Sequence, residues 1–355
     1  MARGIPVLIV AGFLGAGKTT LLNHLLRQRD ARIGVVVNDF GAVNIDAMLV
    51  AGQVDAMVSL GNGCVCCAVD VGELDEMFER LSQPRNRIDV IVVEASGLAE
   101  PRNLIRMVLG SDNPRIHYGG LLEVVDAEHF EDSRALHPEL AAHLRLADLV
   151  VLNKADRIPE PHLARLRTEL TATVEPAPVY ATTHGRIDPR LLFDVPRRGE
   201  PTVAEQLSFD ELLAEHHHHD DDGHRHLHDD YDTVTFTSAT PLDPRALVEF
   251  LEKPPPGLFR AKGPVVFAVA GEHRKFLLHM VGRHVVFEPL TARGESEQTC
   301  VVLIGAGLDA EVVTRRLEAT AHTDPDPLDA QTLLGVWHYV PRDLSDSLEY
   351  ADLPE

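Results

Sequence analysis

The 355-residue sequence has little positive charge. It contains 33 Lys and Arg residues against 55 Asp and Glu residues, which gives a formal net charge of −22 at pH 7. Nucleic acids and anionic membrane surfaces bind to Lys/Arg patches, and such an excess of carboxylates would repel them. The composition therefore predicts no nucleic-acid partner and no membrane partner, and it favours a cationic ligand.

The sequence also lacks a long hydrophobic run. No segment approaches the roughly 18 to 20 consecutive apolar residues that a membrane span needs. The first apolar run, Ile5–Ala11, is short and leads directly into a glycine-rich loop, so it does not fit a signal peptide. We therefore expect a cytoplasmic protein.

Cysteine is scarce, with four residues, but three of them stand together as Cys64, Cys66 and Cys67. A reducing cytosol would keep them as thiols, which argues against a disulfide framework. The preceding Gly-Asn-Gly can fold this loop so that several thiolates point at one centre, and thiolates favour Zn²⁺ or Cu(I). Because zinc usually takes four donors, one position would remain for another side chain or an exchangeable partner. The alternative, three buried core thiols, is disfavoured by the flanking glycines.

Strands and helices alternate over residues 1–195. The predicted strands are Ile5–Ala11, Ile33–Asn38, Asp89–Glu94, Gly120–Asp126 and Leu149–Asn153. Their nearly continuous apolar character is typical of a parallel sheet that is buried on both faces. With helices between the strands, the pattern predicts an α/β fold of the P-loop NTPase type, with a doubly wound, mostly parallel sheet.

Three further regions follow this domain. Residues 231–340 are predicted to form a second, smaller α/β domain, with strands at Thr233–Ser238, Pro264–Ala270, His284–Phe287 and Cys300–Ile304. Residues 341–355 form an acidic tail. Residues 196–230 are predicted to be a linker, because their His/Asp-rich part has no core-forming residues.

The linker contains seven histidines among carboxylates. They are His216, His217, His218, His219, His224, His226 and His228. Imidazole binds transition metals, and neighbouring carboxylates raise the local cation concentration, so weak accessory metal capture is expected. A solvated acidic linker without a metal role is the alternative.

A phosphate-binding motif follows the first strand. The sequence G-F-L-G-A-G-K-T, from Gly12 to Thr19, matches G-x-x-x-x-G-K-[ST] and lies between a strand and a helix. Its backbone N–H groups can close around phosphate oxygens at the start of the helix. Lys18 is predicted to contact the β- and γ-phosphates, and Thr19 to bind Mg²⁺. The predicted phosphate-contacting set is Gly12, Gly15, Ala16, Gly17, Lys18, Thr19 and Thr20.

Two more strand ends complete the predicted nucleotide site. Asn153, Lys154 and Asp156 form N-K-x-D after the fifth strand, at the edge where doubly wound sheets bind ligands. The Asp156 carboxylate can accept hydrogen bonds from N1–H and the exocyclic amine of guanine, which favours GTP over ATP. Glu94 can hold Mg²⁺ through water, and Gly97 leaves its N–H free for the γ-phosphate. Asp126, at another strand end, is predicted to cap a helix or a turn.

Five motifs stand in the order of a known family. G-F-L-G-A-G-K-T, N-D-F-G, G-N-G-C-V-C-C, E-A-S-G-L-A-E-P and N-K-A-D resemble those of the CobW family of metal-chaperone GTPases. The resemblance implies a Mg²⁺-dependent GTPase whose C-x-C-C loop binds zinc and whose nucleotide state changes the metal affinity, so that metal passes to a client metalloprotein. Asp39 stands where the family usually has Glu, and its shorter side chain would have less reach toward the metal.

Other interpretations stay open. In a metal store, the His/Asp segment would buffer ions and the GTPase would be incidental. A P-loop kinase would prefer ATP, against which Asn153 and Asp156 argue. Within the family, Co²⁺ or Ni²⁺ can replace Zn²⁺, a cobalamin-pathway cobalt-handling GTPase is an alternative, and assembly into a homo-oligomer is undecided. No residue marks itself as the group that orients the attacking water, so slow intrinsic turnover is expected.

Overall fold

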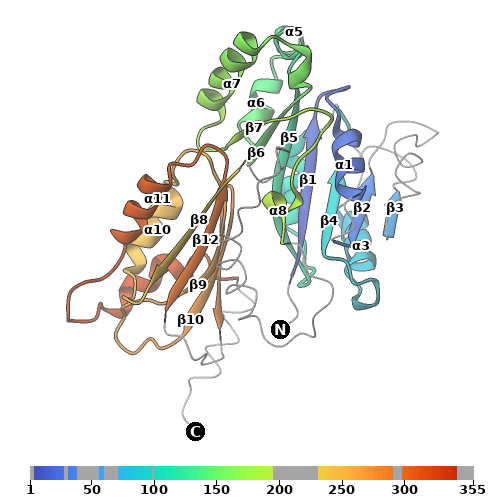
Figure 1. The fold of residues 1–355 in the computed structure, drawn as a ribbon. Helices are drawn as coiled ribbons and strands as arrows, with labels where there is room; N and C mark the ends of the chain where they lie inside the picture. Colours follow the sequence, from blue (N-terminus) through green and yellow to red (C-terminus); the bar gives the residue numbers. More distant parts are fainter. Residues whose placement is uncertain are drawn as a thin grey trace, which may run out of the picture.

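The computed structural model describes residues 4–27, 31–37, 56–59, 71–97, 100–194, 231–290 and 298–341. They form two sheets with their covering helices (Figure 1). The predicted linker and residues 342–355 of the predicted tail lie outside the described residues. Among the described helices, none has the length and apolar content of a membrane span.

The first sheet has seven strands in the order β3-β2-β4-β1-β5-β6-β7, and its strand pairs are parallel. The strands are β1 Ile5–Gly12, β2 Ile33–Val37, β3 Ala56–Ser59, β4 Val90–Glu94, β5 Ile116–Asp126, β6 Leu149–Asn153 and β7 Val179–Ala181. All five predicted strands are confirmed, and β3 and β7 are additional. β4 and β6 are buried along their whole length, as expected for a sheet covered on both faces.

Helices cover both faces of this sheet. α1 Lys18–Arg27 and α8 Pro189–Leu192 pack on one face, where Leu21 and Leu191 join the strand side chains. α3 Val71–Leu81 and α4 Pro101–Leu109 pack on the other face through Phe78 and Leu104. The remaining helices, α5 Phe130–Leu136, α6 Leu140–Leu144 and α7 Glu160–Val174, cover the β5 to β7 side. The doubly wound prediction is confirmed.

The second sheet has five antiparallel strands in the order β11-β10-β9-β12-β8. They are β8 Asp232–Ser238, β9 Leu258–Val265, β10 Lys275–Val281, β11 His284–Leu290 and β12 Thr299–Gly305. α10 Pro244–Glu252 and α11 Ala310–Glu318 cover the face turned away from the first sheet (Figure 1), with α12 Leu334–Trp337 completing the core. Side chains along β10 alternate between buried and half-buried, as in a sheet with one apolar face.

The predicted strand Pro264–Ala270 is wrong over most of its length. β9 ends at Val265, and the following residues make isolated bridges to Leu242 and Leu328 instead. β9 begins directly after the sequence Pro-Pro-Pro-Gly and contains Arg260 and Lys262. Those two charged side chains interrupt the apolar pattern that would mark a strand. Both are paired with the Asp194 carboxylate of the first domain instead of being exposed to solvent.

A bulge in β5 lets the second domain approach the first sheet. The register between β1 and β5 shifts so that Val7 pairs with Tyr118 and Leu8 pairs with Gly120. Gly120 has φ +112°, and a Cβ there would lie 2.8 Å from Val281 and 3.5 Å from Phe259. Because only glycine leaves this space open, the bulge provides a seat for two side chains of the second domain. Phe259 is fully buried in the core that contains α1.

Polar contacts fix the same junction. The Tyr118 hydroxyl and the Leu121 N–H both donate to Oδ2 of Asp148, at 2.5 and 2.9 Å. The β10–β11 turn packs so closely on this carboxylate that a Cβ on Gly282 would lie 1.7 Å from Oδ1. Burial raises the pKa of Asp148 to about 6, against the hydrogen bond from Tyr118.

A second ionic contact lies at Asp194, the last described residue before the predicted linker. Its two carboxylate oxygens accept hydrogen bonds from Arg260 Nη2 at 2.5 Å and from Lys262 Nζ at 2.6 Å. Arg260 and Lys262, the charged residues that interrupt the apolar pattern of β9, therefore connect the two domains.

Candidate nucleotide-binding site

The loop between β1 and α1 contains the predicted phosphate-binding residues. Gly12, Gly15 and Gly17 have φ values of +141°, +76° and +104°, a region that residues with side chains rarely adopt. A Cβ at Gly12 would lie 2.3 Å from the Val124 carbonyl oxygen, and a Cβ at Gly17 would lie 2.3 Å from Asn153 Nδ2. Gly12 and Gly17 are therefore required by both backbone conformation and space. Thr20 lies exposed in the first turn of α1.

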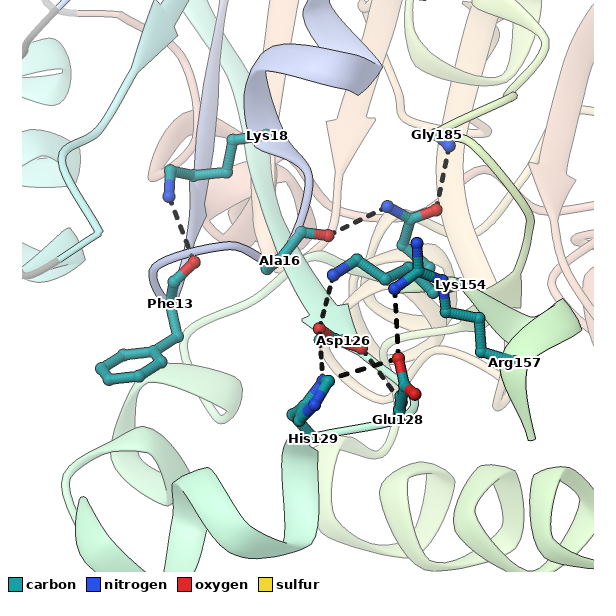
Figure 2. Close-up of polar contacts among 10 residues, drawn as sticks. Phe13, Ala16, Lys18, Asp126, Glu128, His129, Lys154, Arg157 and Gly185 are labelled. Atoms are coloured by element: carbon teal, nitrogen blue, oxygen red, sulfur yellow. Dashed lines mark hydrogen bonds and ion pairs between the residues drawn. The ribbon is translucent and has the colours of Figure 1, made fainter.

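Lys18 is buried and bends back over this loop. Its Nζ donates to the Gly12 carbonyl at 2.9 Å and to the Phe13 carbonyl at 3.3 Å, the latter visible in Figure 2. These contacts hold the ammonium group beside the loop whose N–H groups would surround phosphate.

The two residues predicted to hold Mg²⁺ are hydrogen-bonded to each other. Thr19 Oγ1 donates to Glu94 Oε1 at 2.8 Å, and Glu94 is 2% exposed at the end of β4. A hydroxyl and a carboxylate are hard oxygen donors that suit Mg²⁺. Gly97 lies in the turn after β4, where an added Cβ would lie 2.9 Å from the backbone nitrogen of Leu14. The turn therefore packs directly on the phosphate-binding loop.

Asn153 joins three loops. Its Nδ2 donates to the Ala16 carbonyl at 2.9 Å, and its Oδ1 accepts from the Gly185 N–H at 2.9 Å. Figure 2 shows Ala16 and Gly185 on opposite sides of this amide. The loop after β7 was not predicted to belong to the site. His184 and Gly185 both have positive φ there, and the Thr-His-Gly sequence was the available signal.

Lys154 and Asp126 form an ion pair beside the loop. Lys154 Nζ donates to Asp126 Oδ2 at 2.7 Å (Figure 2), and the Glu128 N–H donates to Oδ1 at 3.0 Å. Burial opposes ionisation, but hydrogen bonds from Lys154, Glu128 N–H and His129 hold the pKa of Asp126 below its usual value. Asp126 thus forms the predicted turn and also orients Lys154. Asp156 is exposed in the short 3-10 helix Ala155–Arg157, where a base can reach it.

A cavity of about 380 Å³ lies between the phosphate-binding loop, the end of β5 and helices α5 and α6. Glu123 lines it and is 3% exposed, and its Oε2 has no hydrogen-bond partner among the described residues. Burial raises the pKa of Glu123 to about 8, and Lys18 opposes the rise. Sequence inspection missed this residue, although a glutamate inside the apolar run G-L-L-E-V-V-D was a usable signal.

The predicted zinc residues lie outside the described residues. These are Asp39, Cys64, Cys66 and Cys67, together with the seven histidines of the linker. Within the described part of the chain, Asp126, Glu128 and His129 place three ligand-type atoms within 4.8 Å of one another. Lys154 and Arg157 already pair with the two carboxylates, so we assign no metal to this group.

Two family models match the chain. The model described as "CobW/HypB/UreG, nucleotide-binding domain" matches residues 6–181. The model described as "Cobalamin synthesis protein cobW C-terminal domain" matches residues 231–321.

Named relatives match most of the chain. A protein named zinc chaperone CobW from Sinorhizobium sp is 30% identical over 337 residues, which cover 85% of this chain and 92% of the relative. A protein of the same name from Pseudomonas aeruginosa is 30% identical over 363 residues, covering 88% of this chain and 90% of the relative. The crystal structure of the Zn(II)-bound YjiA GTPase from Escherichia coli is 22% identical with a TM-score of 0.42, covering 90% of this chain and 100% of that one.

Proposed function

Because the chain belongs to the CobW/HypB/UreG family, we propose that it hydrolyses GTP and delivers a transition metal, in the first instance zinc, to a client metalloprotein. The nucleotide-binding part of this proposal rests on the hydrogen bonds of Asn153. Its amide ties the phosphate-binding loop at Ala16 to the N-K-x-D loop and to Gly185. A phosphate site and a base site are thereby held at a fixed separation, which is the arrangement that a nucleoside triphosphate requires.

Guanine selectivity is assigned to Asp156. Its exposed carboxylate follows the strand end that Asn153 fixes, and it can accept two hydrogen bonds from the guanine edge. Adenine presents no matching pair of donors. Lys154, oriented by its ion pair with Asp126, would cover the base with its aliphatic chain.

Lys18, Thr19 and Glu94 form the proposed hydrolytic centre. Lys18 would exchange its contacts with the Gly12 and Phe13 carbonyls for phosphate oxygens. Thr19 and Glu94 would hold Mg²⁺, which when bound neutralises charge between the phosphates. The Gly97 N–H would donate to the γ-phosphate. Slow intrinsic turnover remains our prediction.

The metal is the cargo in this proposal. Cys64, Cys66 and Cys67 would bind it, with Asp39 as a further ligand, and the relatives named zinc chaperones support zinc over Co²⁺ or Ni²⁺. If nucleotide state changes metal affinity, then metal must change nucleotide affinity by the same factor.

The test is the affinity for GTP with and without Zn²⁺. We expect the two values to differ in the wild type and to coincide in Cys66→Ala. Cys300→Ala is the matched control, because Cys300 lies half-buried in β12 of the second domain, and it should retain the difference. Equal affinities in the wild type would contradict metal–nucleotide coupling.

Base selectivity has its own test. Asp156→Asn should lower GTP affinity by about 100-fold or more and favour a xanthine nucleotide, because the amide donates where the carboxylate accepted. Glu160→Gln, an exposed acid at the start of α7, should change neither affinity. An unchanged GTP affinity in Asp156→Asn would remove the assignment.

A metal store is the alternative that the seven linker histidines favour. Deletion of residues 216–230 separates the two functions. A store would lose most of its bound metal, whereas a chaperone would keep one tightly bound ion at the cysteines.

A further inference from the structure

Two buried glutamates flank the strand that leads into the phosphate-binding loop. On one side Glu94 of β4 pairs in register with Val10, and on the other Glu123 of β5 pairs with Ala11, the residue before Gly12. Thr19 donates to Glu94. Glu123 lines the cavity, and its buried Oε2 has no hydrogen-bond partner among the described residues, so its charge is not satisfied by the hydrogen bonds that usually accompany a buried carboxylate.

The charged groups around Glu123 come from four elements. Lys18 at the start of α1 is the cation that acts on it. Asp126 on the same strand, His129 next to α5 and Lys154 after β6 line the same cavity. Lys154 and His129 both contact Asp126, at 2.7 and 3.2 Å, so that this carboxylate is already compensated.

The other walls of the cavity are apolar apart from Ser133. Phe13 and Leu14 of the loop, Phe130 of α5, and Leu140 and Leu144 of α6 line it. No charged side chain from these positions can compensate Glu123. Lys18 is therefore the cation that Glu123 shares with any phosphate in the loop.

We propose that nucleotide binding is coupled to proton uptake by Glu123. In basic solution and without nucleotide, the ionised Glu123 carboxylate balances part of the charge of Lys18. When phosphates approach Lys18, they bring several negative charges into the same water-poor region, and an additional carboxylate is disfavoured there. Glu123 then takes one proton from solvent onto a carboxylate oxygen, and no other bond forms or breaks. The inference rests on the proposed nucleotide site and assigns Glu123 a positioning role rather than a catalytic one.

The direction of the linkage follows from the charges. Burial already raises the pKa of Glu123 to about 8, so the carboxylate is ionised only in basic solution. Added phosphate charge raises this pKa further. Above about pH 8, nucleotide binding therefore requires protonation of Glu123, which costs free energy. We expect the affinity for GDP to fall about tenfold between pH 7 and pH 9.

The experiment is calorimetric titration of the full chain with GDP and Mg²⁺ at about pH 8.5. The titration is run in HEPES and in Tris, whose ionisation enthalpies differ, so that the difference in binding heat gives the number of protons exchanged. The wild type should take up a substantial fraction of one proton. Glu123→Gln should bind GDP without that uptake and with a flatter pH profile, because its side chain stays neutral. Glu128→Gln, an acid of the β5–α5 turn, should exchange protons like the wild type.

Equal proton uptake in the wild type and in Glu123→Gln would overturn the proposal. If Glu123→Gln does not fold, the wild-type pH profile decides: an affinity for GDP that stays constant between pH 7 and pH 9 refutes the coupling. Absence of binding heat in either buffer would contradict the nucleotide function itself, which separates the two failures.

Discussion

The two sheets bury polar side chains for different reasons. In the parallel sheet, Glu94, Glu123 and Asn153 are nearly inaccessible and stand at or near the carboxyl ends of their strands, around one loop. In the antiparallel sheet, Thr299 is fully buried, and its hydroxyl accepts a hydrogen bond from the Val266 N–H. Buried polar side chains at the carboxyl ends of the parallel strands therefore surround the proposed ligand site, whereas buried Thr299 serves the internal structure of the second sheet.

The difference follows from how each sheet is covered. Parallel strands are enclosed on both faces, so a charged group inside one is expensive unless a ligand or a cation uses it. The antiparallel strands have one apolar and one partly accessible face, and their charged residues emerge at the domain junction. Asp194 with Arg260 and Lys262 is the example.

The largest effect that tests this comparison is expected at Lys18. Lys18→Ala should lower the rate of GTP hydrolysis by about 10² to 10³-fold, because it removes the cation closest to the phosphates. Its thermal unfolding temperature should stay close to that of the wild type. Lys253→Ala, an exposed lysine after α10, is the matched control and should leave the rate unchanged. If Lys18→Ala hydrolyses GTP at a rate within a few-fold of the wild type, the buried polar residues around this loop do not serve a nucleotide.

The next effect concerns the pH dependence of stability. The pKa of Glu123 is raised from 4.5 to about 8, so the neutral form stabilises the fold fully below about pH 4.5, and this contribution is lost as the pH rises through 8. Since a tenfold change in a proton equilibrium corresponds to about 1.4 kcal/mol, the loss is on the order of 4 kcal/mol.

Denaturant unfolding at pH 5 and pH 8 measures it. The free energy of unfolding should fall less in Glu123→Gln than in the wild type over this interval. Parallel changes in the two proteins would show that folding does not raise the pKa of Glu123.

A somewhat smaller effect is expected at the domain junction. Gly282→Ala should lower the free energy of unfolding by about 3 kcal/mol, because the new Cβ meets the Asp148 carboxylate and φ is +56°. Gly271→Ala is a matched control with φ +76° and open space, so it isolates the backbone cost of about 1 kcal/mol. Equal losses in both variants would show that the turn does not need its close contact with the first sheet.

The smallest effect is expected at Thr299. Thr299→Val should cost about 1 to 2 kcal/mol, because the Val266 N–H loses its acceptor. Nucleotide affinity should be unchanged. A loss of nucleotide binding at constant stability would show that Thr299 serves the ligand site and not only the internal structure of the second sheet.

Features formed by residues that are contiguous in the sequence could be predicted, whereas contacts between distant residues could not. The phosphate-binding loop and the N-K-x-D loop are each one short motif, and the parallel strands are near-continuous apolar runs, so both were accessible to inspection. β10 was missed because its side chains alternate between buried and half-buried. The position of β9 was missed because Arg260 and Lys262 are charged and pair with Asp194 of the other domain. The link from Asn153 to Gly185 spans 32 residues and depends on how β6 and β7 pair. The cysteine loop and Asp39 lie outside the described residues and stay predictions.

The glycine bulge of β5 bears on how this protein can be engineered. Phe259 and Val281 occupy the space that Gly120 leaves, and Phe259 belongs to the core around α1. A fragment ending at Asp194 would expose that apolar hollow to water, and we expect it to self-associate. The GTPase half is therefore a poor candidate for transplantation as a free-standing module, and fusion or truncation designs should keep both halves on one polypeptide.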